Sequence, residues 1–174
     1  MSPMPRKEIH VHIRPMVPQD LGEVTYIEHQ SYYNGWIDED FKICLKQDFI
    51  SEVAVFDGEI AGFMICMLGK RKISVVKLVV STYLRRHKIG SQMIGRVIPK
   101  LSHKERNRMV VEVEETNDVA IHFLVANRFK AVNVLPDRFE RIVSPDEITK
   151  QDAYLMIYKL KPLPANRLKG LGRP

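Results

Sequence analysis

The chain has 174 residues, 45% of them hydrophobic and 28% charged, which is typical of a single folded domain with a full core. No run of residues is apolar for long enough to cross a membrane, and the first residues lack the apolar region of a secretion signal, so we expect a cytoplasmic protein. The formal net charge of +6 favours acidic partners, such as phosphate-bearing cofactors or nucleic acid.

The two ends of the chain differ in composition from the rest. Residues 1–7 and the basic, Pro- and Gly-rich residues 161–174 show no hydrophobic periodicity, so we predict a flexible leader and a flexible tail. Residues 8–160 would then form one domain. Within it, Cys44 and Cys66 lie in apolar contexts and are expected to be buried and reduced rather than paired in a disulfide.

Hydrophobic periodicity divides the domain into strands and helices. We expect strands at residues 8–17, 51–56, 59–68, 73–80, 108–115, 130–134 and 152–160. We expect helices at residues 18–32, 37–47, 91–98 and 119–128. The pair Asp57-Gly58 predicts a tight hairpin turn, whereas the polar, irregular residues 136–152 predict a loop. This order predicts one mixed α/β domain with helices on a central sheet.

The stretch Val75 to Ile98 combines a β-branched run, the basic turn RRHKIG and a helical pattern. A helix start offers unpaired backbone N–H groups and the positive end of the helix dipole, so this turn is expected to hold a phosphate. Arg85, Arg86 and Lys88 add positive charge at the same place. The chain lacks the GxxxxGK[ST] pattern of a P-loop and the GxGxxG pattern of a dinucleotide-binding fold.

Three other groups of residues have both a functional and a structural interpretation. His10 and His12 would share a strand face, but no third ligand is near in sequence, so we expect surface histidines and no metal site. The aromatic residues between Tyr32 and Trp36 form either a wall of a substrate cleft or a packed corner. The basic residues 70–72 are explained by a solvated hairpin tip, and nucleic acid is not expected as a partner because no aromatic residues alternate with them.

Two blocks of sequence resemble the GNAT superfamily of acetyl-CoA-dependent N-acetyltransferases. Arg85 to Gly90 is similar to the family pattern (Q/R)-x-x-G-x-(G/A), with a strand before it and a helix after it. Residues 110–129, VVEVEETNDVAIHFLVANRF, resemble LEVRxSNxxAIxLYxxxGF of the RimI-like branch, which acetylates protein N-terminal amines. Two shorter matches are residues 36–41 with PWSxxxF and residues 151–156 with EDAxxM. The resemblance covers nearly all of residues 8–160.

The resemblance implies a single GNAT-like α/β domain, with a mostly antiparallel central sheet, a splayed parallel pair of strands and helices on both faces. It implies an enzyme that transfers an acetyl group from acetyl-CoA to a primary amine, and the RimI-like features favour a protein or peptide N-terminus. The alternatives are an acetyltransferase for small amines and a non-catalytic acetyl-CoA-binding interaction module. The resemblance leaves the oligomeric state open.

The resemblance also assigns site residues. Glu112 takes the position of the base that accepts the proton of the amine, with Glu114 and His122 as substitutes, although spacing alone favours a solvated strand face for Glu112 and Glu114. A backbone N–H of residues 77–80 would stabilise the thioester oxygen. The residues expected to bind the cofactor are Leu78, Val79, Val80, Arg85, Arg86, His87, Lys88, Ile89, Gly90, Ser91 and Asn117.

Three residues depart from the family pattern. Lys88 and Arg128 replace glycines, and a left-handed backbone at either position would strain a residue that has a side chain. Leu124 replaces the tyrosine that protonates the leaving thiolate, and a leucine donates no proton. Tyr154, expected on a strand near Glu112, is the candidate replacement donor, and its structural interpretation is a packed strand aromatic.

Overall fold

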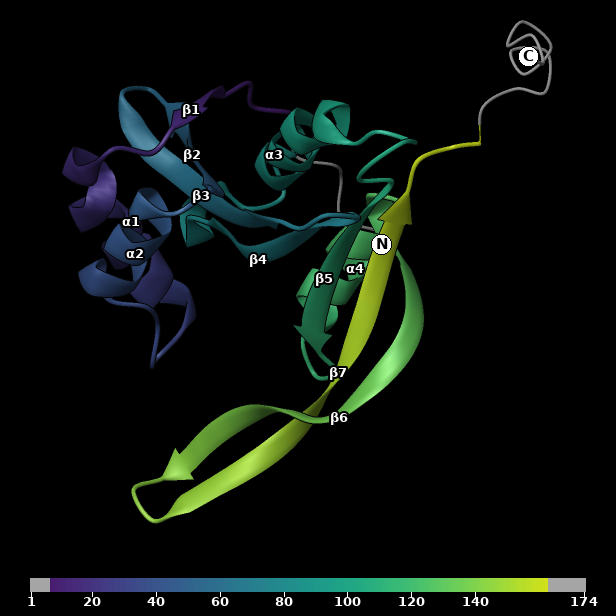
Figure 1. Cartoon of the computed structure of the whole chain (residues 1–174). Coiled ribbons are helices and arrows are strands. Elements are labelled where there is room, and N and C mark those ends of the chain that lie inside the picture. Colours follow the sequence, from purple (N-terminus) through teal and green to yellow (C-terminus); the bar gives the residue numbers. More distant parts are fainter. Residues whose placement is uncertain (1–6, 163–174) are drawn as a thin grey trace, which may run out of the picture.

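A computed structural model describes residues 7–162, and most of the expected leader and tail lies outside this range. The described residues form a seven-stranded sheet in the order β1-β2-β3-β4-β5-β7-β6 (Figure 1). The strands are β1 His12–Pro15, β2 Phe49–Phe56, β3 Glu59–Leu68, β4 Lys72–Val80, β5 Arg108–Glu114, β6 Lys130–Ser144 and β7 Glu147–Lys159. The helices are α1 Leu21–Ser31, α2 Asp38–Lys46, α3 Ile89–Val97 and α4 Asp118–Ala126.

The sheet is antiparallel except where β4 and β5 meet. These two strands run parallel and pair only at their first residues, Lys72–Ser74 with Arg108–Val110. Beyond them β4 stays paired with β3, and β5 stays paired with β7, so the sheet divides into two halves that separate (Figure 1). The predicted fold, with its splayed parallel pair, is confirmed.

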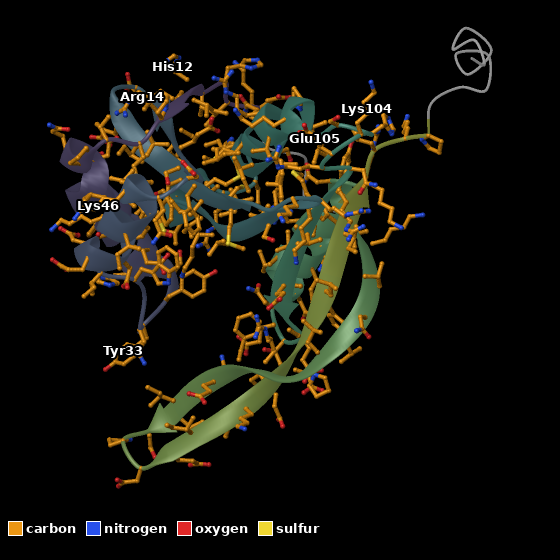
Figure 2. All side chains as sticks on the ribbon, in the orientation of Figure 1. His12, Arg14, Tyr33, Lys46, Lys104 and Glu105 are labelled. Atoms are coloured by element: carbon orange, nitrogen blue, oxygen red, sulfur yellow. The ribbon has the colours of Figure 1, made fainter. Side chains whose placement is uncertain are left out.

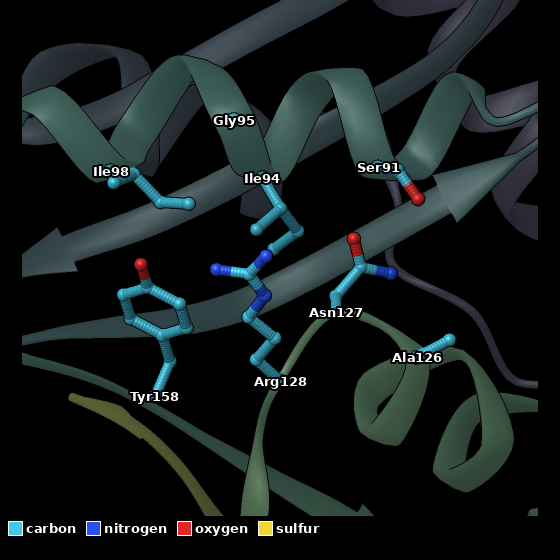
Figure 3. Close-up of a pocket in the computed structure, with 8 residues that line it drawn as sticks. All are labelled: Ser91, Ile94, Gly95, Ile98, Ala126, Asn127, Arg128 and Tyr158. Carbon is cyan, nitrogen blue, oxygen red and sulfur yellow. The ribbon is translucent and has the colours of Figure 1, made fainter. Parts of the chain in front are cut away.

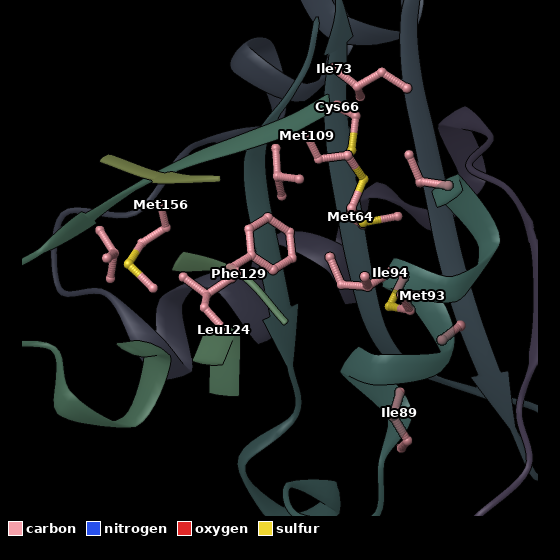
Figure 4. Packing of buried hydrophobic residues seen from close by; sticks show 14 of the residues in the cluster. Met64, Cys66, Ile73, Ile89, Met93, Ile94, Met109, Leu124, Phe129 and Met156 are labelled. Carbon is pink, nitrogen blue, oxygen red and sulfur yellow. The ribbon is translucent and has the colours of Figure 1, made fainter. Parts of the chain in front are cut away.

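Helices cover both faces of the sheet, as expected. The side chains of β3 alternate between two hydrophobic clusters, with Phe63 and Ile65 in one and Met64 and Cys66 in the other. The first cluster packs under α1 and α2 and includes Leu21, Val24, Ile27 and Phe41. The second packs under α3 and α4 and includes Ile73, Met93, Ile94, Met109, Leu124, Phe129 and Met156 (Figure 4). Both cysteines are buried and free, which confirms that prediction.

Most predicted elements lie within a few residues of the observed ones. Asp57 (φ 52°) and Gly58 (φ 82°) both have the left-handed backbone of a type I′ turn, which confirms the predicted β2–β3 hairpin. The first strand is shorter than expected. His10 and His12 are exposed, and no group of three metal-ligating side chains occurs within residues 7–162.

The prediction of a loop at residues 136–152 is wrong. These residues form the outer half of a long β6–β7 hairpin, which closes in a two-residue turn between Ser144 and Glu147 (Figure 1). Phe139 pairs with Gln151 there, and most side chains on both faces are exposed. Because neither face is buried, the sequence carries no alternation of polar and apolar residues. No helix within residues 7–162 has the length and hydropathy needed to cross a membrane.

Candidate active site

The gap between β4 and β5 exposes one backbone edge of β4. Ser81 donates its backbone N–H to the Ala61 carbonyl on β3, with an N···O distance of 2.8 Å. Backbone groups alternate sides along a strand, so Leu78 and Val80 direct theirs away from β3 and toward the gap. In agreement, the Val80 carbonyl accepts a hydrogen bond from Arg85 Nε at 3.1 Å. The N–H groups of Leu78 and Val80 are therefore the donors that β4 offers to a ligand in the gap.

The turn from β4 to α3 has two left-handed residues that are not glycine. Arg86 has φ 68° and Lys88 has φ 62°, and α3 begins at the next residue, Ile89. The left-handed backbone of Lys88 explains why the resembled family has glycine at this position, since glycine adopts it without strain. Lysine keeps the path of the backbone but adds a conformational cost of about 1–2 kcal/mol.

The basic side chains of this turn have different surroundings. The Arg85 guanidinium donates from Nη2 to Ser31 Oγ at 2.7 Å, in addition to its bond to Val80, so it ties the end of α1 to the end of β4. Lys88 Nζ lies 3.2 Å from a Glu8 carboxylate oxygen, and Arg86 is exposed. The phosphate contacts predicted for these three residues stay predictions, and Arg86 has the side chain with the fewest protein contacts.

The chain segment ahead of β1 lies along this turn and along α3, and we call residues 7–11 the N-terminal strap. His87 contributes two contacts: its carbonyl accepts from Ile9 N at 3.2 Å, and its Nδ1 lies 2.6 Å from the Lys7 carbonyl oxygen. The Gln92 amide on α3 donates to the Ile9 carbonyl at 2.6 Å and accepts from Val11 N at 3.2 Å. The strap therefore contacts the residues on both sides of the strained Lys88.

The start of α3 packs closely against α4. A Cβ atom on Gly90 would lie 3.0 Å from two ring atoms of Phe123, so a larger residue here would force the Phe123 ring to shift. Further along, α3 and the end of α4 border a hollow of about 170 Å³. Among its lining residues are Ser91 from the predicted motif and Asn127, Arg128 and Tyr158, which sequence reasoning did not assign to the site (Figure 3).

Arg128 follows α4 in a left-handed conformation, with φ 68°. Phe129 N donates to Leu124 O, and Arg128 N donates to Val125 O, both at 3.0 Å, which is the hydrogen-bond pattern of a Schellman C-cap. At the other end of α4, Asn117 Oδ1 accepts from Ala120 N at 3.1 Å and caps the helix. The predicted contact between Asn117 and the cofactor is not tested by this arrangement.

The two carboxylates of β5 face the side of the sheet that carries α1 and α2. Met109 and Val113 pack in the opposite cluster, so Glu112 and Glu114 project away from it. Glu112, whose side chain is 35% exposed, forms an ion pair with Arg138 of β6, and its carboxylate raises the pKa of the Arg138 guanidinium. Glu112, the predicted base, therefore lies beside the gap and is paired with the Arg138 guanidinium.

The candidate proton donor lies on the other face. Tyr154 pairs with Val113 across β7 and β5, and it packs against the cluster that contains Leu124. Tyr154 therefore lies on the strand next to that of Glu112, but its side chain is on the opposite face of the sheet, the face that carries Leu124. His122 is exposed on α4, where its Nδ1 lies 2.7 Å from the Asp118 carbonyl oxygen.

A buried ion pair fixes the connection between α1 and α2 against β4, and sequence reasoning missed it. Glu28 of α1 is fully buried and pairs with Lys77 of β4, which is 17% exposed. The Lys77 ammonium lies 4.6 Å from the ring centroid of Tyr32 and 5.1 Å from that of Trp36. Glu28 Oε1 also accepts from Trp36 N at 3.1 Å. A Cβ on Gly35 would lie 2.6 Å from Glu28 Cγ, which explains the glycine.

This connection is half exposed and faces β5. Within this connection, burial of the Tyr32 hydroxyl raises the pKa of Tyr32. The negative charges of Glu28 and Glu114 also raise it, and the positive charge of Arg85 lowers it. Tyr33 is 98% exposed and projects away from the helices (Figure 2). Tyr32, Trp36 and Lys77 therefore form one wall beside the gap, and Glu112 and Glu114 stand on the other.

Comparisons with known proteins agree with this architecture. The profile of the acetyltransferase (GNAT) family matches residues 20–127. Structures with the same fold include the ribosomal-protein-S18-alanine N-acetyltransferase from Escherichia coli, at 16% identity and TM-score 0.75, covering 90% of this chain and 98% of that chain. NAA60 from Arabidopsis thaliana, in complex with a bisubstrate analogue, has 20% identity and TM-score 0.74, with coverage of 86% and 98%.

Naa20 from Chaetomium thermophilum, also in complex with a bisubstrate analogue, has 18% identity and TM-score 0.75, with coverage of 86% of this chain and 87% of that chain. The sequence has no significant match among curated proteins. The structural neighbours share the fold, and the profile covers more than half of the sequence. The chain therefore belongs to the acetyltransferase (GNAT) family and is an acetyltransferase.

Proposed function

We propose that this acetyltransferase uses acetyl-CoA and acts on the N-terminal amine of a protein or peptide. The observation that carries the proposal is the separation of β4 and β5 immediately after their short parallel pairing. The separation gives a ligand access to the backbone donors of Leu78 and Val80, next to the turn from which α3 begins.

The residues around the gap fit acetyl-CoA. The first turn of α3 offers backbone N–H groups to a pyrophosphate, and Arg86 and Lys88 add positive charge beside it. The hollow between α3 and α4 continues from Ser91 and carries the Arg128 guanidinium, a further cation for a phosphate group (Figure 3). These features support a phosphate-bearing donor.

When bound, acetyl-CoA supplies the acetyl group as a thioester. The acceptor amine attacks the carbonyl carbon, so that a C–N bond forms and the C–S bond breaks. The N–H of Leu78 or Val80 stabilises the negative charge that develops on the carbonyl oxygen. Glu112 takes the proton of the amine, directly or through water, after its pair with Arg138 loosens. Tyr154, on the face of Leu124, returns a proton to the thiolate.

The acceptor side favours a peptide over a cationic small amine. Two of its carboxylates, Glu28 and Glu112, are neutralised by Lys77 and Arg138. The wall opposite Glu112 presents the rings of Tyr32 and Trp36, which suit an extended chain with side chains. The fold shared with the ribosomal-protein-S18-alanine N-acetyltransferase, whose name specifies a protein acceptor, supports an acceptor of this kind.

The test measures release of the CoA thiol with three acceptor sets: peptides with free N-termini, the same peptides with blocked N-termini and a free lysine, and polyamines. We expect turnover with the first set only. Glu112→Gln should lower kcat by about 100-fold or more, because it removes the general base. Its dissociation constant for acetyl-CoA should stay at the wild-type value. Glu140→Gln, an exposed change on the β6–β7 hairpin, is the matched control.

Each contrary result points to a defined alternative. Turnover with polyamines alone would show an acetyltransferase for small amines. Tight binding of acetyl-CoA without turnover on any acceptor would show a binding module. Wild-type kcat in Glu112→Gln would remove the proposed base and leave Glu114 as the next residue to test.

A further inference from the structure

Basic residues that are far apart in the sequence meet at one end of the sheet. The β3–β4 turn contributes Lys70 and Arg71, and the connection from α3 to β5 contributes Lys104. The two segments are tied together, since Arg106 Nε donates to the Gly69 carbonyl at 2.7 Å. Sequence reasoning treated residues 70–72 as an isolated hairpin tip, because the α3–β5 connection that lies beside this tip in the fold comes about 30 residues later in the chain.

The first and last residues of three strands extend this group. Lys72 of β4 pairs with Arg108 of β5, and Arg108 pairs with Lys159 of β7, so the three lie in one row across the sheet. Their neighbours Ile73 and Met109 pack into the core under α3 and α4. The three basic side chains therefore project from the other face of the sheet, where side chains in one row lie side by side.

The turn and the connection border a hollow of about 310 Å³, whose lining includes Lys70, Arg71, Lys104 and Arg108. Its one acidic residue, Glu105, is already paired with Arg106 at 3.3 Å. We call this hollow and the adjoining row, made up of Lys70, Arg71, Lys72, Lys104, Arg108 and Lys159, the basic end of the sheet. Six basic side chains thus lie at one end of the sheet, and the hollow among them holds a single acidic residue.

We propose that the basic end of the sheet binds the phosphate backbone of a folded RNA. Rows of lysine and arginine neutralise successive phosphates, which gives affinity without reading bases. The lining of the hollow includes no Phe, Tyr or Trp, and its one ring, that of His103, stands among charged and amide side chains, so it is suited to a backbone rather than to a series of stacked single-stranded bases. The choice of RNA over DNA rests on the proposed function: proteins are synthesised on RNA, so an enzyme that acetylates protein N-termini would meet its substrates beside RNA.

The basic end lies away from the acceptor wall. Lys104 and Glu105 are at one side of the molecule, and Tyr33 and Lys46 are at the other (Figure 2). RNA bound at the basic end would therefore leave the gap between β4 and β5 accessible. Binding of RNA and transfer of acetyl groups can then be measured separately, so that failure of one does not imply failure of the other.

The test is binding of the full chain to a fluorescent RNA hairpin at several salt concentrations. We expect the logarithm of the association constant to fall with the logarithm of salt with a slope of about −3, which corresponds to three or four phosphate contacts. A double variant with Lys70→Glu and Lys104→Glu should bind at least tenfold more weakly, with a slope reduced by about 2. Circular dichroism melting of each variant shows that it is folded.

The control double variant carries Lys42→Glu and Lys46→Glu, two exposed positions on α2, and has the same net charge. It should bind RNA within about threefold of wild type. The proposal is overturned if wild type does not bind the hairpin, if both double variants lose affinity equally, or if a DNA duplex of equal length binds more tightly. Binding to anionic phospholipid vesicles in the absence of RNA binding would overturn it in favour of a membrane surface.

Discussion

Replacing Lys77 with methionine tests whether the ion pair between α1 and β4 fixes the acceptor wall. Methionine keeps most of the volume of the lysine stem but removes the ammonium. Glu28, which is fully buried, would then keep only the hydrogen bond from Trp36 N at 3.1 Å. Its second oxygen, Oε2, already has no hydrogen-bond partner among the described residues. The variant therefore leaves a buried carboxylate without a counter-charge.

Removal of one partner from a buried pair costs about 3–5 kcal/mol. The ammonium is 17% exposed and the carboxylate is not exposed, so we expect the lower part of this range, about 3 kcal/mol, for Lys77→Met. Glu28→Gln should cost less, about 1–2 kcal/mol, because Lys77 stays next to the rings of Tyr32 and Trp36 and can reach water. The double variant should cost less than Lys77→Met alone, since no charge is left unpaired.

The free energy of unfolding would be measured by urea denaturation, with circular dichroism as the probe. Fluorescence of Trp36, the only tryptophan, reports separately on the wall. Lys46→Met, an exposed change at the end of α2, is the matched control and should cost less than about 0.5 kcal/mol. A cost below about 1 kcal/mol for Lys77→Met, or a double variant no more stable than it, would refute the reasoning.

Two further predictions concern the N-terminal part of the chain. Asp20 accepts hydrogen bonds from both Arg14 Nη atoms, at 2.7 and 2.9 Å, and from Val17 N at 2.9 Å. The bonds from Arg14 lower the pKa of Asp20 most, the bond from Val17 acts in the same direction, and burial of the carboxyl opposes them. The stabilisation is complete above the ordinary pKa of an aspartate, about 3.9, and is lost as the pH falls through the lower pKa of the folded state. We therefore expect Asp20→Asn to lower the free energy of unfolding by about 1–2 kcal/mol at pH 7, and by less near pH 3. Urea denaturation at the two pH values measures the difference. Gln92→Leu frees α3 from the N-terminal strap and should raise the dissociation constant for acetyl-CoA about threefold by calorimetry. A dissociation constant equal to that of wild type in Gln92→Leu would contradict the role assigned to the strap.

Local rules predicted the elements whose residues carry a clear signal. The hairpin at Asp57-Gly58 follows from two adjacent residues that tolerate a left-handed backbone. Helix α3 follows from its apolar spacing, which places Ile89, Met93 and Val97 in the core. The turn between β4 and α3 was predicted because the basic residues 85–88 separate a β-branched run from a helical pattern. These features depend on neighbours within one or two turns of chain.

The outer half of the β6–β7 hairpin was missed because its stability does not come from a buried face. Phe139 is half-buried, whereas Ile142 and Ile148 are more than half exposed. Register shifts near residues 135–139 and 142–144 also interrupt any regular period. The usable signal was the turn itself, since Ser144-Pro145-Asp146-Glu147 has the proline and aspartate of a tight turn between two β-branched runs.

The Glu28–Lys77 pair could not be read from either segment alone. Glu28 falls on the apolar face of its helix, with Leu21, Val24 and Ile27, and Lys77 interrupts the apolar run of β4. Each of these charges is an anomaly, because an isolated charge is rarely buried. Taken together, two opposite charges in core positions predict a buried pair. Nothing in the sequence shows that α1 crosses β4 at that point, 49 residues away.

The three departures from the family pattern have different consequences, and the backbone separates them. Lys88 and Arg128 occupy glycine positions yet adopt left-handed conformations, φ 62° and 68°, so the turn and the end of α4 keep their paths at a conformational cost. The strap contacts on His87 and Gln92 offset part of that cost at Lys88.

Leu124 differs from Lys88 and Arg128, because the family tyrosine at this position contributes a hydroxyl proton, and keeping the backbone conformation does not replace that proton. Its side chain is 4% exposed and packs in the core under α4, where it stabilises the fold and donates nothing. In the proposed mechanism the proton for the thiolate would then come from another donor, either water or Tyr154, which packs against that same core cluster. The substitutions at Lys88 and Arg128 thus keep the backbone path of a glycine, whereas the substitution at Leu124 removes a hydroxyl from α4 and, in the proposed mechanism, leaves the proton transfer to a donor elsewhere.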